Sequence, residues 1–220
     1  MKDLDIAPSI LAADFGYLMR DIKAVENNCE YLHIDVMDGH YVDNISLGIP
    51  VIQSIRKYTD IKFYTHLMIT EPEKYIKAFA DCGSDNITFH LECAKDPDKL
   101  IDEIKALGKS AGISIDPDTP VEAVFPYIGK VDIILIMTVY PGFGGQGYLT
   151  SSDERIRKLR KAIDEQGADT IISVDGGVKK SNIKEIYDAG ARLFVAGSAV
   201  FNAEDPGKAV EELKACATLS

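Results

Sequence analysis

Eight short runs of β-branched and other apolar residues alternate with segments of helical periodicity, and this alternation limits the possible folds more than any other feature. Strand and helix alternating without two strands in succession predicts a parallel sheet. The expected strands are Asp5–Ile10, Tyr31–Met37, Lys62–Met68, Asn86–His90, Ser110–Ile115, Asp132–Met137, Thr170–Val174 and Leu193–Ala196. The clearest helical spacings are those of Phe15, Leu18, Ile22 and Val25, of Ile156, Leu159 and Ile163, and of Val210 and Leu213.

The number of strand–helix units favours closure into a (β/α)8 barrel over an open doubly wound sheet. An open sheet usually carries a GxGxxG motif after its first strand, whereas the turn at Ser9–Asp14 contains no glycine. A length of 220 residues suits one large domain better than two small ones, and no linker or composition shift divides the chain. We therefore expect an α/β protein, a (β/α)8 TIM barrel with a single domain over residues 1–220.

Composition and charge argue against several classes of function. Hydrophobic residues make up 46% and charged residues 27%, as in soluble globular proteins, and no run approaches the roughly 20 apolar residues of a membrane span. The segment Met1–Asp5 is acidic where a signal peptide is basic, and the four cysteines lack CxxC spacing, so we expect a cytoplasmic protein with reduced thiols. A net charge of −11 argues against nucleic acid or an anionic membrane as partner. It does not exclude a phosphorylated substrate, because backbone N–H groups at a helix N-terminus can hold phosphate.

A histidine and an aspartate lie on one face of the second expected strand. Side chains alternate along a strand, so His33, Asp35 and Met37 point one way and the aliphatic residues between them point the other. Two polar groups facing an apolar core are costly without a partner such as a cation. For His33 taken alone, a histidine hydrogen-bonded in the core is the alternative.

Other polar residues fall at strand ends, where a barrel places its active site. Ser9 ends the first strand and His66 lies late in the third. His90 ends the fourth strand, and Asp175 follows the seventh. Asp175 could instead cap the next helix, for which Ser181 is another candidate. A set of four nitrogen and oxygen ligands, suited to Zn²⁺, Mn²⁺, Fe²⁺ or Co²⁺, would comprise His33, Asp35, His66 and Asp175.

Six motifs, spread from the first strand to the last, resemble the signature blocks of ribulose-phosphate 3-epimerases. They are Ser9-Ile10-Leu11, His33-x-Asp35-x-Met37-Asp38-Gly39-His40, His66-Leu67-Met68, Pro141-Gly142-Phe143-Gly144-Gly145-Gln146, Val174-Asp175-Gly176-Gly177 and Ala196-Gly197-Ser198. A single block would be weak, but six in order cover nearly the whole chain. The resemblance implies an isomerase of carbohydrate metabolism, a 3-epimerase of a phosphorylated ketose in the pentose phosphate pathway, and a homo-oligomer.

The resemblance also implies roles for single residues. One divalent metal ion would be held by the four ligands named above and would bind the C2 and C3 oxygens of the ketose. Asp35 and Asp175 would exchange the C3 proton from opposite faces through a metal-stabilised enediolate. This division of labour is chemically sensible, because inversion through a planar intermediate needs an acid/base group on each side and the charge needs a Lewis acid.

The remaining expected contacts are with the substrate. The substrate-binding residues would be Ser9, His66, Met37, Met68, Met137, Gly142, Phe143, Gly144, Gly145, Gly176, Gly177, Gly197 and Ser198. The methionines would line the site, or they fill gaps in the core. The segment Gly142–Gly145 would be a mobile loop over the substrate, or it is a plain surface turn. The glycines Gly176 and Gly177, with Gly197 and Ser198, would bind phosphate through backbone groups.

The sequence departs from the family pattern at a few positions. Asp43 stands where the family usually has proline, Tyr64 stands where aspartate is common, and Asp116-Pro117-Asp118 replaces an asparagine-led turn. None of these is a proposed metal ligand. Asp43 follows the second strand and is expected near the mouth of the pocket, which leaves substrate choice more open than reaction type. The roles of His40 and His90 also stay open.

The leading interpretation is a 3-epimerase that interconverts D-ribulose 5-phosphate and D-xylulose 5-phosphate. The alternative is a 3-epimerase of a hexulose 6-phosphate such as D-allulose 6-phosphate. Related lyases and decarboxylases carry Asp-x-Lys-x-x-Asp, and the second strand here, Asp35-Val36-Met37-Asp38, has no lysine. A non-catalytic phosphosugar-binding barrel would have lost a metal ligand, and none is lost.

Overall fold

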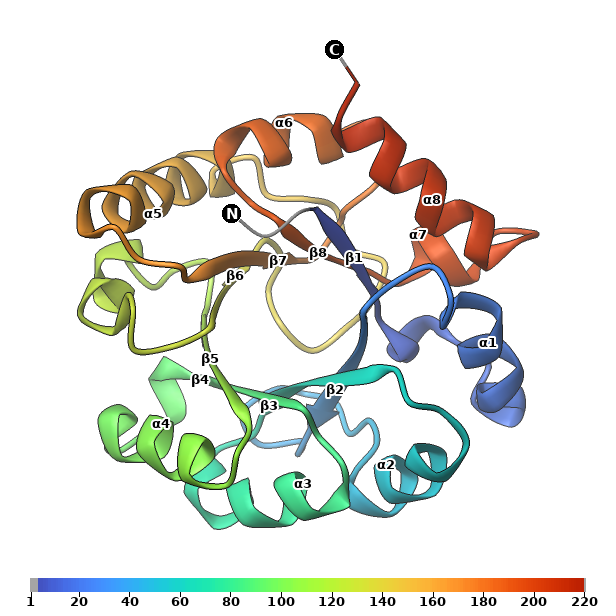
Figure 1. Cartoon of the computed structure of the whole chain (residues 1–220), viewed down its shortest axis with the longest axis horizontal. Coiled ribbons are helices and arrows are strands. Elements are labelled where there is room, and N and C mark those ends of the chain that lie inside the picture. Colours follow the sequence, from blue (N-terminus) through green and yellow to red (C-terminus); the bar gives the residue numbers. More distant parts are fainter. Residues whose placement is uncertain (1–3, 220) are drawn as a thin grey trace.

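Eight parallel strands form a barrel at the centre of the molecule (Figure 1). The computed structural model describes residues 4–219, so residues 1–3 of the acidic N-terminal segment and Ser220 of the predicted domain lie outside the described residues. The sheet order is β1-β8-β7-β6-β5-β4-β3-β2, and a parallel bridge between Ser9 and His33 joins its two ends. The predicted (β/α)8 fold class is confirmed. The strands are β1 (Asp5–Pro8), β2 (Tyr31–Met37), β3 (Lys62–Met68), β4 (Asn86–His90), β5 (Ser110–Ile115), β6 (Ile133–Met137), β7 (Ile171–Asp175) and β8 (Leu193–Ala196).

Helices surround the barrel (Figure 1). The α-helices are α1 (Leu18–Val25), α2 (Ile49–Ile55), α3 (Ile76–Cys82), α4 (Pro97–Ala106), α5 (Ser152–Gln166), α6 (Ile183–Ala189), α7 (Ser198–Phe201) and α8 (Pro206–Ala217). The 3-10 helices are η1 (Ile10–Ala12), η2 (Phe15–Tyr17), η3 (Arg56–Tyr58), η4 (Pro72–Lys74), η5 (Leu91–Cys93) and η6 (Val121–Tyr127). The local sequence determines where two helices begin. Asp96 and Asp205 cap the N-termini of α4 and α8, and each is followed by a proline, which suits the first helical position.

Three strand predictions are wrong by one or two residues. The first strand ends at Pro8, because the Ser9 side chain caps η1 and Ile10 already belongs to that 3-10 helix; Ser9 itself makes only the single bridge to His33. The sixth begins at Ile133, although the backbone N–H of Asp132 still donates to the carbonyl oxygen of Ala111 and its carboxylate accepts the N–H of Ala111. The seventh runs from Ile171 to Asp175 instead of Thr170–Val174, since the Thr170 hydroxyl bonds to the preceding loop and Asp175 pairs with Met137.

The predicted helix faces are mostly confirmed. The spaced residues of α5 and α8, which are Ile156, Leu159, Ile163, Val210 and Leu213, are all buried. Phe15 is the exception, because Asp14 caps the short turn η2 and α1 starts only at Leu18, leaving Phe15 half exposed. Between β5 and β6 the chain forms only η6, which contains Pro126, a residue unsuited to a helix interior.

Alternation along β2 separates the core from the site. Leu32, Ile34 and Val36 belong to the hydrophobic core between the sheet and its helices. His33 and Asp35, on the other face, are buried inside the barrel. Within residues 4–219 no helix combines the length and the apolar character that crossing a membrane requires.

Candidate active site

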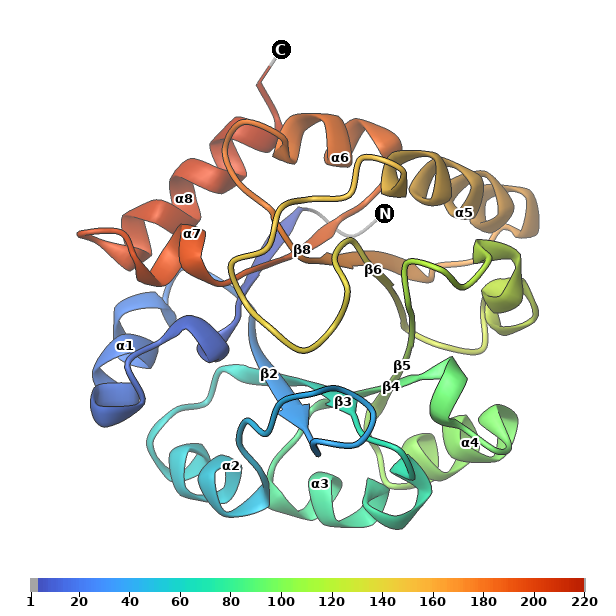
Figure 2. The same cartoon turned by 180° about the vertical axis from the view of Figure 1, so that it is seen from behind.

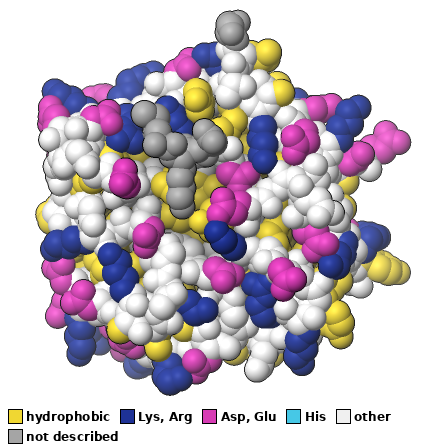
Figure 3. Space-filling view, in the orientation of Figure 1, with side chains coloured by type: hydrophobic (Ala, Val, Ile, Leu, Met, Phe, Trp, Pro, Cys, Tyr) yellow, Lys and Arg dark blue, Asp and Glu magenta, His cyan; other side chains and the backbone are white. Residues whose placement is uncertain are grey.

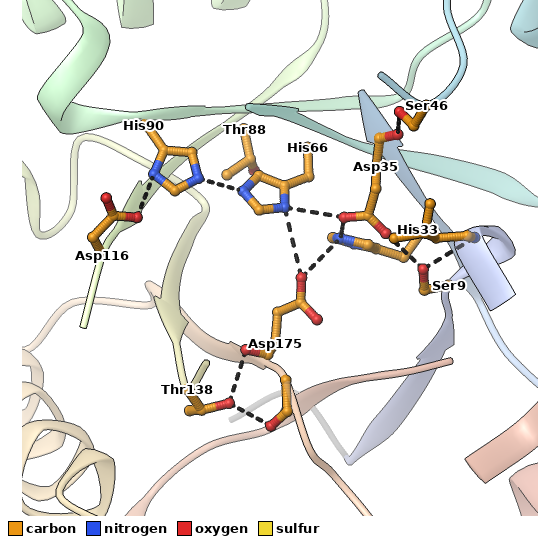
Figure 4. Close-up of polar contacts among 12 residues, drawn as sticks. Ser9, His33, Asp35, Ser46, His66, Thr88, His90, Asp116, Thr138 and Asp175 are labelled. Atoms are coloured by element: carbon orange, nitrogen blue, oxygen red, sulfur yellow. Dashed lines mark hydrogen bonds and ion pairs between the residues drawn. The ribbon is translucent and has the colours of Figure 1, made fainter. Parts of the chain in front are cut away.

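Two histidines and two aspartates meet at the C-terminal ends of three strands (Figure 4). His33 and Asp35 come from β2. His66 comes from β3, and Asp175 is the last residue of β7. Nε2 of His33 lies 3.1 Å from Oδ1 of Asp35 and 3.5 Å from Oδ2 of Asp175. Nδ1 of His66 lies 3.3 Å and 3.7 Å from the same two oxygens. The structure therefore brings all four predicted ligands together, with opposite ring nitrogens of the two histidines facing the centre.

The geometry and charge of the four groups fit a divalent cation. Ligand atoms about 2.1 Å from a tetrahedral ion lie about 3.4 Å from one another. The four nitrogen–oxygen separations, 3.1 to 3.7 Å, bracket that value. The two carboxylates carry two negative charges, which one divalent cation neutralises, and imidazole with carboxylate is a donor set for first-row ions.

Attraction within the cluster holds both aspartates in the ionised form. Burial raises the pKa of the Asp35 carboxyl, but His33 and His66 outweigh burial and hold that pKa well below its usual range. The pKa of Asp175 is also lowered, because hydrogen bonds from the same histidines outweigh burial. Burial lowers the pKa of His33, but Asp35 and Asp175 raise it to about 9. Ionised carboxylates are the form that binds a cation or removes a proton.

Hydroxyl groups fix the two aspartates in place. Ser9 donates a hydrogen bond of 2.6 Å to Oδ2 of Asp35, and Ser46 donates one of 2.5 Å to its backbone carbonyl. Thr138 donates to the backbone carbonyl of Asp175 at 2.8 Å. The Asp35 side chain is 5% exposed and the Asp175 side chain 17%, so Asp175 is the more open of the two.

A cavity lies above the cluster at the C-terminal end of the barrel. In Figure 2 the loop that follows β6 crosses this end of the molecule. Figure 3 shows the opposite end, where acidic and basic side chains are interspersed. His33 and His66 are fully buried and do not line the cavity. The other predicted site residues all line it: Ser9, Asp35, Met37, Met68, Met137, Gly142, Phe143, Gly144, Gly145, Asp175, Gly176, Gly177, Gly197 and Ser198.

The loop after β6 is held at both ends of its glycine-rich part. The Gln146 side chain donates to the carbonyl oxygens of Tyr140 and Phe143, at 2.7 Å and 2.8 Å. Asn44, from the loop after β2, donates to the carbonyl oxygen of Gly142 at 2.7 Å. The loop thus contacts the cavity and is tied to β2, while its movement over a substrate stays a prediction.

The far wall of the cavity is made by backbone that only glycine permits. Gly176 and Gly177 have φ angles of 120° and 67°. A Cβ atom at Gly177 would lie 2.4 Å from the backbone nitrogen of Tyr148, which is closer than real contacts allow. Beside them α7 starts at Ser198, and its N-cap residue, Gly197, has no side chain to bond the first N–H groups.

Gly177→Ala should therefore displace the loop at Tyr148 and lower kcat/KM by roughly 10-fold or more, because a small shift of the groups that line the cavity misplaces whatever binds there. Steady-state kinetics measures kcat/KM, and thermal unfolding shows whether the variant is still folded. Gly147→Ala is the matched control: nothing lies within 4 Å of a Cβ there, and its φ is not positive, so it should behave as wild type. Equal kinetics for the two variants would contradict the role given to Gly177.

Several residues at the site had no definite role assigned from the sequence. His90 is fully buried, and its Nε2 lies 2.8 Å from Nε2 of His66. With Glu92 and Asp116 it forms a second group of possible metal ligands. His40, by contrast, is exposed. Strand alternation, which gives His90 the same inward face as Thr88 and Asn86, could have identified His90. The cavity is also lined by Leu11, Ala12, Val139, Pro141, Gln146, Val178 and Val195, whose mostly apolar side chains suggest no chemistry.

The departures from the family pattern have definite positions. Tyr64 is fully buried, and its ring meets the His33 ring edge-on with centroids 4.5 Å apart. Asp43 is exposed and is not among the residues that line the cavity. The alternative role of Asp175 as a helix cap is wrong, because α6 begins at Ile183 after Asn182. Ser181 does not cap it either.

The fold and the site together define a (β/α)8 barrel with a candidate divalent-metal centre at its C-terminal end. A sequence model of the ribulose-phosphate 3-epimerase family matches residues 5–201. The chain belongs to this family. Ribulose-phosphate 3-epimerase from Bacillus subtilis is 43% identical over 213 residues, covering 96% of this chain and 98% of its own. The Synechocystis enzyme of the same name is 44% identical, covering 95% and 92%. The chloroplastic ribulose-5-phosphate-3-epimerase of Arabidopsis thaliana is 42% identical, covering 97% and 77%.

Solved structures with little sequence identity share the fold. A 3-hexulose-6-phosphate synthase superposes with a TM-score of 0.66 at 21% identity, covering 98% of this chain and 99% of that one. Orotidine 5′-phosphate decarboxylase from Pyrococcus horikoshii gives a TM-score of 0.69 at 14% identity, covering 98% and 100%. These likenesses support the barrel architecture alone.

Proposed function

We propose that this protein interconverts D-ribulose 5-phosphate and D-xylulose 5-phosphate by two-base proton transfer. Its family and the names of relatives at 42–44% identity support the activity. The observation that carries the mechanism is the pair Asp35 and Asp175, two carboxyl groups from separate strands that direct one oxygen each at the same two histidines. Epimerisation through a planar enediolate needs such a pair, one on each face.

The proton transfers are assigned to the second oxygens of the carboxylates. In each turnover one aspartate is ionised and removes the C3 proton, while the other must first take up a proton, which it delivers to the opposite face of the planar carbon; the two groups thereby exchange protonation states. Ser9 holds Oδ2 of Asp35 at 2.6 Å and so fixes the direction from which that group acts. A lowered pKa makes each carboxylate a weak base, so a cation held beside the pair would supply the Lewis acidity that the reaction needs. His33 and His66, with Asp35 and Asp175, would hold that cation, which we propose to be Zn²⁺, Mn²⁺, Fe²⁺ or Co²⁺.

The rest of the cavity would bind and enclose the substrate. Backbone N–H groups around Gly177 and Ser198, with the start of α7, would hold the phosphate, since none of the residues between 4 and 219 that line the cavity is lysine or arginine. Met37, Met68 and Met137 are at most 5% exposed yet line the cavity, so they would place an apolar, polarisable surface over the reacting carbon and exclude water. Residues 1–220 would form one domain, and the protein would be a homo-oligomer as the resemblance implies.

A direct comparison of substrates tests this assignment. We expect kcat/KM for D-ribulose 5-phosphate to exceed that for D-allulose 6-phosphate by about 10-fold or more, because one extra carbon between metal and phosphate sites misplaces the reacting centre. A coupled assay on both ketoses with the metal-loaded protein measures the ratio. A preference for the hexulose would overturn the substrate assignment and leave the two-base mechanism standing.

A further inference from the structure

We propose that His90 is a positioning residue, which keeps the hydrogen of His66 on Nε2 and thereby leaves Nδ1 of His66 free to bind the cation. The inference rests on the metal site of the proposed function. His90 ends β4, is fully buried and does not line the cavity, so it cannot touch the substrate there. Its influence would pass through the ring of His66.

The two rings meet through one pair of nitrogens (Figure 4). Nε2 of His66 and Nε2 of His90 are 2.8 Å apart, and the rings are tilted by only 21°. Two neutral imidazoles at this distance share a single hydrogen. If Nδ1 of His66 gives its lone pair to a cation, the hydrogen of that ring is on Nε2 and points at His90. His90 must then accept at Nε2 and carry its own hydrogen on Nδ1.

The surroundings of Nδ1 of His90 favour a hydrogen at that position. The hydroxyl oxygen of Tyr41 lies 2.8 Å away, Oδ1 of Asp116 lies 3.3 Å away and Oε2 of Glu92 lies 3.5 Å away. Tyr41 donates its own hydrogen to Oδ2 of Asp116 at 2.6 Å, so its oxygen is free to accept. The hydrogen bonds then run in one direction: His66 donates to His90, His90 donates to Tyr41, and Tyr41 donates to Asp116.

The reverse arrangement, with the hydrogen of His90 on Nε2, leaves a nitrogen lone pair facing carboxylate oxygens. If His90 donated from Nε2, its Nδ1 lone pair would face two carboxylates, Asp116 and Glu92, at 3.3 Å and 3.5 Å. Tyr41 could donate to that nitrogen only by giving up its hydrogen bond to Asp116. His66 would also carry its hydrogen on Nδ1, where it would block the cation. The carboxylates around His90 therefore select the His66 tautomer that binds metal.

The same placement of hydrogens explains why the group around His90 should hold no cation when the group around His66 holds one. A cation held by His90, Glu92 and Asp116 would take the Nδ1 lone pair of His90 and force its hydrogen onto Nε2. With His66 bound to its own cation, two hydrogens would then occupy the 2.8 Å contact. While both rings are neutral, the two sites exclude each other, so one ion per chain is expected.

Nitrogen NMR of the zinc-loaded protein, labelled with ¹⁵N in its four histidines, reads the tautomers directly. Long-range ¹H–¹⁵N spectra distinguish a ring with its hydrogen on Nε2 from one with it on Nδ1. We expect the Nε2–H form for His66 and the Nδ1–H form for His90. An Nε2–H form for His90 would overturn the proposal.

Zinc affinity, measured by competition with a chelator, tests the energetic consequence. His90→Leu removes the acceptor and should weaken Zn²⁺ binding by about 10- to 100-fold. His90→Gln can still accept from Nε2 of His66 and should stay closer to wild type. Asn86→Leu is the matched control, because Asn86 is a buried polar residue on the same face of β4 whose side chain bonds to Ser110 and Thr88 instead of His66; the variant should bind Zn²⁺ as wild type does.

The possible results separate this inference from the proposed function. Should His90→Leu fail to fold, Tyr41→Phe removes the acceptor for the Nδ1 hydrogen of His90, and we expect a smaller loss of Zn²⁺ affinity. Wild-type affinity in both His90→Leu and Tyr41→Phe would overturn the role of His90 and leave the epimerase assignment intact. A wild-type protein that bound no Zn²⁺ would overturn the metal site itself.

Discussion

Asp175→Asn should abolish epimerisation, with kcat falling about 10³-fold or more, because one of the two proton transfers loses its partner and the charge of the metal site is disturbed. Asparagine keeps the shape of the side chain and one oxygen toward His33 and His66. Asp35, held by Ser9 at 2.6 Å, stays in place as the base for the other face. In D₂O we therefore expect deuterium to enter one ketose phosphate without conversion to its epimer, as followed by NMR.

The design includes a mirror variant and a control. Asp35→Asn should show exchange in the opposite epimer, and the metal content of each variant must be measured alongside, since either change can eject the ion. Asp118→Asn removes a carboxylate that, within residues 4–219, accepts a hydrogen bond from Tyr140 alone, and it should keep wild-type activity. Near wild-type epimerisation by metal-loaded Asp175→Asn would mean that a single mobile base, or a water molecule, serves both faces.

Removing the metal should have an effect of similar size. Protein stripped with a chelator is expected to lose activity by roughly 10³-fold, because Lewis-acid stabilisation of the enediolate is worth several kcal/mol. Adding back Zn²⁺, Mn²⁺, Fe²⁺ or Co²⁺ should restore it. Elemental analysis of protein purified without chelator should find one ion per chain. A fully active, metal-free protein would remove the basis for the proposed chemistry.

A pair of histidine variants ties this effect to the cluster. His66→Ala should lose the ion and should not recover on metal addition, because Nδ1 of His66 supplies one of four ligands. His40→Ala changes another histidine in the segment after β2, but His40 is exposed and, in the described part of the chain, hydrogen-bonds only to its neighbour Asp38. It should keep one ion and full activity. Loss of the ion in both variants would indicate that general destabilisation, not ligation, controls metal content.

Much of the fold was predictable because its signals are local. The period-two alternation of β2 depends only on neighbouring residues, and it placed His33 and Asp35 inside the barrel while Leu32, Ile34 and Val36 pack outward. The apolar spacing of α5 and α8 worked for the same reason. Errors arose at the ends of strands, as at Ser9, where a side-chain cap starts a 3-10 helix and the strand stops.

The candidate ligands could also be identified from the sequence, because histidine and aspartate at the end of a strand can be recognised in each strand separately. The arrangement of their atoms could not be predicted in this way. That His33 presents Nε2 and His66 presents Nδ1, and that Ser9 reaches Asp35, depends on barrel closure between residues far apart in the chain.

By itself the sequence determined the strand–helix order, the inward faces, the family and the set of site residues, since residue type and short-range periodicity carry that information. Only the tertiary structure decided that Tyr148 crosses Gly177 and that His90 pairs with His66 and is bonded in turn by Tyr41. These contacts join separate strands and loops. Their geometry is set by sheet register and by the packing of the whole barrel, which no local pattern of residues specifies.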